Sequence, residues 1–225
     1  MEQFATPAPI AVVLGVPAGR IRLIAADRED TVVEVLPADR SKGRDAEAAR
    51  KALVSYEAGV LRVEIPEGKR SGLIGGSAGA VEVTVRTPAG SRVEAVVADA
   101  EFRGVGRLGE VVLEAARAEV KLDEAEGARL TLQAGDVAVG RLGGPARIGT
   151  QKGDVRIAEA VGGEVALETG YGEIVVGVAR GVSASLDAGT GHGRVRNSLN
   201  NTSGPYPALT LRATTGYGDI TAHSL

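Results

Sequence analysis

GDVAV at 135–139 recurs, with small changes, as GDVRI at 153–157, GEIVV at 172–176, GRVRN at 193–197 and GDITA at 218–222. Each copy begins with glycine, continues with a polar residue and has a β-branched residue third. A second apolar alternation precedes each copy, as in ARLTLQ at 128–133 and EVALET at 164–169. Self-similarity at a nearly fixed spacing indicates a repeat architecture, so these phrases decide the fold.

Each repeat is predicted to hold two short strands joined by glycine-rich turns, because apolar and polar residues alternate with period two. Two weaker copies, at 91–104 and 109–124, bring the number of units between Ser91 and Leu225 to seven. The third and fifth residues of each phrase should point inward: Val137, Val139, Val155, Ile157, Ile174 and Val176. The second residues should point outward: Asp136, Asp154, Glu173, Arg194 and Asp219.

A repeat of this length is too short for a strand–helix–strand unit or a four-stranded propeller blade. We therefore predict an all-β fold, a single-chain parallel β-solenoid (β-helix) of about seven coils of 17–25 residues, stacking to roughly 34 Å at the strand spacing. The composition agrees, because 3% aromatic residues and 32 glycines suit a thin tube filled by small side chains. An up-and-down meander is the competing fold.

Residues 1–90 are predicted to form a β-rich N-terminal region and cap, and residues 91–225 the repeats, although one continuous domain would also fit. Strand-like runs lie at 10–16, 20–25, 31–37, 60–66 and 80–88. The one helix is expected near 45–56, with Asp45 as its cap and Glu47 paired with Lys51. A loop is expected at 198–207. No cap follows the last repeat, so Asp219, Ile220 and Thr221 form the candidate pairing edge.

The composition argues against several classes of function. The chain has no cysteine and only two histidines, His192 and His223, so we expect no metal, no cofactor and no disulfide. GVGRLG at 104–109 and GGSAG at 75–79 are both followed by strand-like residues, which favours turns over a nucleotide site or a Ser77 nucleophile elbow. A net charge of −3 does not favour nucleic acid. Without a long apolar run or a leader, we expect no membrane span and a cytoplasmic location.

Two outward columns are candidate sites. The first is a ladder of mostly carboxylates: Glu119, Asp136, Asp154, Glu173, Arg194 and Asp219. It is interpreted as a solvated face, with a catalytic acid pair as the alternative. The second column consists of the residues that directly precede the repeat glycines. After Ala134, its members are Lys152, Tyr171, His192 and Tyr217. Coil spacing would bring Tyr171 and His192 close enough to touch, so this column is the candidate interaction surface.

Several phrases resemble one known family. They include DTVVEVLPADRSKGRDAEAA at 30–49, GSRVEAVVADAEFRGVGRLG at 90–109 and TTGYGDITAHSL at 214–225. They are similar to the actinobacterial branch of a domain-of-unknown-function family labelled "putative adhesin". The resemblance implies a β-solenoid and brings no catalytic motif.

The sequence therefore favours a non-catalytic scaffold or protein-interaction module over an enzyme. Its partner would be another protein or a second copy, bound through the C-terminal edge of the solenoid. Two alternatives remain: a self-assembling filament resembling bactofilins, and a carbohydrate-active enzyme or adhesin that binds polysaccharide on its outward face.

Overall fold

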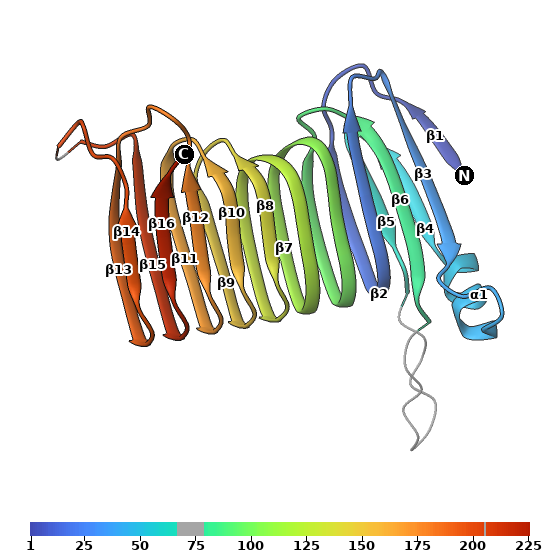
Figure 1. The fold of residues 1–225 in the computed structure, drawn as a ribbon. Coiled ribbons are helices and arrows are strands. Elements are labelled where there is room, and N and C mark those ends of the chain that lie inside the picture. Colours follow the sequence, from blue (N-terminus) through green and yellow to red (C-terminus); the bar gives the residue numbers. More distant parts are fainter. Residues whose placement is uncertain (67–78, 205) are drawn as a thin grey trace.

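The computed structural model describes residues 1–66, 79–204 and 206–225 (Figure 1). Sixteen strands belong to one continuous sheet, and the helix among the described residues is α1 (Gly43–Arg50). The all-β prediction is thereby confirmed.

The repeats place their strands in two rows that run side by side along the molecule (Figure 1). Beyond the long strand β7 (Arg92–Ala134), one row contains, in spatial order, β8 (Val137–Leu142), β10 (Val155–Ala160), β12 (Ile174–Val178), β16 (Ile220–Ser224) and β14 (Val195–Ser198). The other contains β9 (Ala146–Lys152), β11 (Gly163–Tyr171), β15 (Leu209–Tyr217) and β13 (Ala184–His192). Every pairing between these neighbours is parallel, so equivalent residues of successive repeats lie in register.

The N-terminal residues continue the same rows. Strand β2 (Ala11–Ala26) pairs in parallel with β7, and on its other side with β5 (Val60–Glu64) and β6 (Val81–Pro88). Antiparallel strands then end the rows: β1 (Glu2–Ala5), β3 (Asp30–Pro37) and β4 (Leu53–Glu57). The strand-like runs read from this region are therefore strands.

The expected helix is shorter than its sequence pattern suggests. It ends at Arg50, and residues 53–57 form β4 instead, because they pair antiparallel with β5 through a tight turn in which Ala58 (φ 50°) and Gly59 (φ 79°) are left-handed. Asp45 does not cap the helix. Its side chain is buried in the first turn and accepts a hydrogen bond from the amide of Ala80 at 3.0 Å. The predicted Glu47–Lys51 pair is confirmed.

The last two repeats are inverted in space relative to the sequence. The final strands β15 and β16 lie between β11–β12 and β13–β14, rather than outside them (Figure 1). Ile220 is therefore paired on both sides, with Ile174 and with Val195. The predicted edge at Asp219, Ile220 and Thr221 is wrong, because the chain leaves one position open after β12, forms β13 and β14 beyond it, and then fills the open position with β15 and β16.

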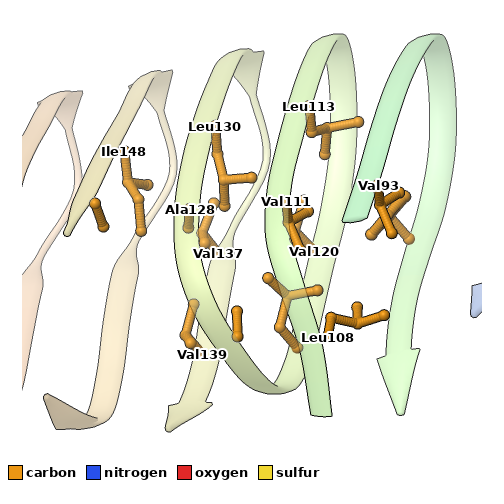
Figure 2. Close-up of a cluster of buried hydrophobic side chains, with 14 of the residues drawn as sticks. Val93, Leu108, Val111, Leu113, Val120, Ala128, Leu130, Val137, Val139 and Ile148 are labelled. Carbon is orange, nitrogen blue, oxygen red and sulfur yellow. The ribbon is translucent and has the colours of Figure 1, made fainter. Parts of the chain in front are cut away.

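The core is a stack of aliphatic side chains between the two rows. Figure 2 shows part of it, with Leu113, Leu130, Ile148, Val137 and Val139 pointing into the space between the strands. All of these side chains are at most 3% exposed. The six inward residues named from the first three repeat phrases, from Val137 to Val176, are likewise buried.

Candidate interaction site

The repeat glycines form a column at one corner, where each repeat turns from one row into the other. Their φ angles lie between 129° and 157°, a region that favours glycine. A Cβ atom built at any of them would lie only 1.8 to 2.1 Å from a carbonyl oxygen of the neighbouring repeat. These close contacts fix the position of each repeat relative to the next. In spatial order, the glycines of the column are Gly135, Gly153, Gly172, Gly218 and Gly193.

The outward acids beside this column bind the backbone. Oδ1 of Asp136 accepts a hydrogen bond from the amide of Asp154, and Oδ1 of Asp154 accepts one from the amide of Glu173, both at 2.9 Å. Oδ1 of Asp219 accepts one from the amide of Arg194 at 2.9 Å. Each carboxylate thus ties one repeat to the next, which favours a structural role for the ladder over a catalytic pair.

A column of threonines lies on the inner side of the same corner. The hydroxyls of Thr169, Thr190 and Thr215 donate to carbonyl oxygens of corner glycines in neighbouring repeats, at 2.9, 2.9 and 3.1 Å. This column was not predicted from the sequence. Its signal is present in the phrase TGYG or TGHG, which occurs at 169–172, 190–193 and 215–218.

The predicted column Lys152, Tyr171, His192 and Tyr217 is brought together, but in a different order. Tyr217 stacks on Tyr171 with ring centroids 4.9 Å apart and on His192 at 4.5 Å, with the planes within 5° of parallel. Lys152 is in register with Tyr171 on its other side. The predicted contact between Tyr171 and His192 is absent, because the inverted order of the repeats places Tyr217 between them.

This ring column has a defined chemical character. Tyr171 is 59% exposed and Tyr217 49%, and His192 is exposed as well. Both faces of Tyr217 are covered by its neighbours, so it presents its edge and hydroxyl to solvent. The free face of His192 lies at the outermost repeat. A planar ligand could stack on that face, and polar groups could contact the ring edges along the column.

The outermost repeat, β13 and β14, pairs on one side only within the part of the chain that the structure describes. On β13, the backbone carbonyl of Ser183 accepts a hydrogen bond from the amide of Leu209, at the start of β15. The backbone amide of Ala184 points to the opposite side and donates a hydrogen bond to the carbonyl of Asn200. Successive residues of a parallel strand direct their backbone groups alternately to opposite sides. The amides and carbonyls of Leu186, Ala188 and Thr190 therefore face the free edge.

Strand β14 has a matching free edge. The carbonyl of Arg194 accepts the amide of Ile220, so the backbone groups of Val195 and Asn197 point away from β16. The side chain of Val195 is 44% exposed although it occupies an inward position. Oδ1 of Asn197 accepts the amide of Leu199 at 3.0 Å, which turns the chain at the end of the strand.

Residues 200–203, which follow β14, protect only the beginning of β13. Besides the carbonyl of Asn200, which accepts the amide of Ala184, the hydroxyl of Ser183 accepts the amides of Thr202 and Ser203 at 3.1 and 3.0 Å. Beyond Ala184 these contacts stop, so the free edge extends over the rest of β13.

Other motifs give no site. GVGRLG at 104–109 lies within β7, and every later helix or strand in the described part of the chain is a strand. GGSAG at 75–79, with Ser77, lies outside the described residues except for Gly79. No three acidic or histidine side chains gather as a metal site within 1–66, 79–204 and 206–225. None of the helices described there is long and apolar enough to cross a membrane.

No protein-family model matches the chain, and no curated protein matches it. Among solved structures, it is similar to a "putative cell adhesion protein" from Clostridium sporogenes ATCC 15579, with 15% identity, 100% of this chain and 98% of that chain covered, and a TM-score of 0.42. A "putative adhesin" from Parabacteroides distasonis ATCC 8503 gives 14% identity, coverage of 98% and 95%, and a TM-score of 0.49. A "putative adhesin" from Bacteroides fragilis NCTC 9343 gives 12%, coverage of 98% and 95%, and 0.39.

Proposed function

We propose that the chain is a β-solenoid that acts as a non-catalytic scaffold and protein-interaction module, and that it binds its partner by strand addition at β13 and β14. The observation that carries the proposal is the free edge. Five residues, Leu186, Ala188, Thr190, Val195 and Asn197, direct backbone amides and carbonyls away from the rest of the sheet. Unpaired edges of this kind are templates for another strand.

The hydrophobic interior also continues to this end. Leu186 and Ala188 are half-buried and Val195 is 44% exposed, whereas the equivalent inward residues of interior repeats are buried. An added strand would cover these side chains while pairing their backbone. Strand addition thus combines main-chain hydrogen bonds with apolar burial, the two contributions that such complexes use.

The alternatives have less support from the geometry. A filament needs two complementary ends, but the opposite end carries antiparallel strands and α1 (Figure 1). A glycosidase would need two free acids, but Asp136 and Asp154 are engaged with the backbone. A polysaccharide-binding surface would benefit from open ring faces, but Tyr217 is covered on both faces.

A photo-crosslinking amino acid at Gly189 tests the proposal. Gly189 lies on β13, and a side chain there meets nothing within 4 Å. In the cells that produce the protein, we expect a crosslinked protein adduct of defined mass. Ala188→Pro should abolish the adduct, because it removes an amide that faces the free edge without removing a bond to β15.

Ser185→Ala is the matched control, since it changes an outward side chain of the same strand and leaves the edge amides in place. Its adduct should persist. Thermal unfolding of both variants verifies that they remain folded. An adduct that survives Ala188→Pro, or the absence of any adduct, would overturn strand addition at this edge.

A further inference from the structure

We infer that the occupant of the free edge is a second copy of this chain, joined head to head so that β13 of each copy runs antiparallel beside β14 of the other. The inference rests on the proposed function, whose partner it names. The resulting particle is a closed dimer with two-fold symmetry.

The number and the direction of the free strands point to a second copy. β13 ends at His192 and β14 begins at Val195, so the two edges are joined by a turn and run in opposite directions. One extended peptide could pair with only one of them. The same end of a second copy presents two free strands with the same separation and opposite directions, so a two-fold axis parallel to the strands satisfies both edges at once.

Exposed charges on the two free strands favour one of the two possible two-fold arrangements. Asp187 lies on the outer face of β13 and Arg196 on the outer face of β14, and both are exposed, although Arg196 also forms an ion pair with Asp219 of its own chain at 3.2 Å. Pairing β13 with the partner's β14 places these opposite charges on adjacent strands, twice by symmetry. The other two-fold arrangement would place each strand beside its own copy, with Arg196 near the partner's Arg196 and Asp187 near the partner's Asp187. Like charges on neighbouring strands are unfavourable, so the crossed arrangement is preferred.

Assembly stops at the dimer because the two ends of the molecule differ. The opposite end of the molecule presents β1 and β4, which are antiparallel additions, and α1 packs beside β3 there (Figure 1). That end does not repeat the geometry of β13 and β14. The described residues of each copy therefore form one edge of this kind, and pairing consumes it, which gives a dimer and not a polymer.

Light scattering coupled to size exclusion measures the predicted species. From low concentration up to about 1 mM, the weak end of specific affinities, the mass should rise from 22.9 kDa toward twice that value and then stop. Ala188→Pro should remain at 22.9 kDa at every concentration, while Asp187→Ala should weaken the dimer without abolishing it.

Charge reversal tests the crossed arrangement. Asp187→Arg alone and Arg196→Asp alone should each weaken the dimer at least fivefold, because each places like charges on the paired strands. An equimolar mixture of the two variants should dimerise as well as the wild type, because each interface contact again joins opposite charges. Thermal unfolding of each variant establishes that its fold is intact.

The outcomes separate this inference from the proposed function. A wild-type monomer at all concentrations, together with an edge-dependent crosslink at Gly189 to another protein, overturns the second copy and retains strand addition. A monomer without any such crosslink overturns both. A dimer that persists in Ala188→Pro, or a mass that grows without limit, overturns the head-to-head pairing.

Discussion

Replacing Gly153 with alanine tests the reasoning that the corner glycines hold the repeats in phase. Gly153 has a φ of 148°, and a Cβ there would lie 2.1 Å from the carbonyl oxygen of Gly135. Real Cβ contacts are not shorter than 3.0 Å, so the two repeats must separate by about 1 Å or the turn must change. Both groups are backbone, and neither can move aside as a flexible side chain would.

The expected cost follows from two contributions. A non-glycine residue in such a backbone conformation costs about 1–3 kcal/mol. Disrupted packing and hydrogen bonds between the two repeats add to this, so we expect roughly 3–5 kcal/mol in the free energy of unfolding, at the upper end of single substitutions. For a chain of this size, the melting temperature should fall by about 2–4 °C for each kcal/mol.

Gly149→Ala is the matched control, four residues away in β9. A Cβ there meets nothing within 4 Å, and its φ is not positive. Alanine should therefore be neutral or stabilising by about 0.4–1 kcal/mol, because it restricts the unfolded chain. Chemical unfolding followed by circular dichroism compares the two variants. If Gly153→Ala fell within about 0.5 kcal/mol of Gly149→Ala, the spread of ordinary surface substitutions, the reasoning would be refuted.

The remaining predictions concern the order of the repeats, the acid ladder and the rings. In this cysteine-free chain, cysteines at Asp187 and Arg212 should form a disulfide under oxidation, whereas cysteines at Ala166 and Asp187 should not, because β15 separates β11 from β13. Mass spectrometry of the oxidised protein distinguishes the pairs. Asp154→Ala should destabilise by about 1–2 kcal/mol through loss of its hydrogen bond to the next repeat, and Asp154→Asn, which keeps an acceptor, by less; equal effects in urea unfolding would contradict this. Tyr217→Ala should lower the free energy of unfolding by about 0.5–1.5 kcal/mol more than the loss of buried area alone would. Tyr217→Phe, which keeps the ring, should change it almost not at all.

The strands and their inward faces could be predicted because both follow from short local patterns in the sequence. Period-two alternation identifies the strands, and glycine in a fixed position identifies the corner. The end of the helix could not be predicted in the same way. Residues 53–57 are strand because β5 pairs with them across the turn at Ala58 and Gly59. That pairing is a tertiary contact, which a local helix pattern does not report.

The candidate site was predicted in its membership and not in its order. Lys152, Tyr171, His192 and Tyr217 share a column because each precedes a corner glycine, a fact the sequence contains. Their spatial order depends on which repeat stacks on which. The three last phrases, TGYGEI, TGHGRV and TGYGDI, are so similar that any of them fits the same corner. Corner residues therefore carry no information about the order of the coils.

The inward residues supply that information. Strand β16 places Ile220 and Ala222 inward, and both are buried between neighbours. Strand β14 places Val195 and Asn197 in the same positions. If β14 were the interior strand, the side-chain amide of Asn197 would be enclosed between two repeats. Without new hydrogen-bond partners, its burial would cost about 1–3 kcal/mol of stability. The apolar pair of β16 would then lie at the open end. Placing the polar strand outermost avoids both penalties, so the inverted order follows from one asparagine and one alanine at equivalent positions. The same asparagine keeps the open end polar enough to remain in water before it pairs.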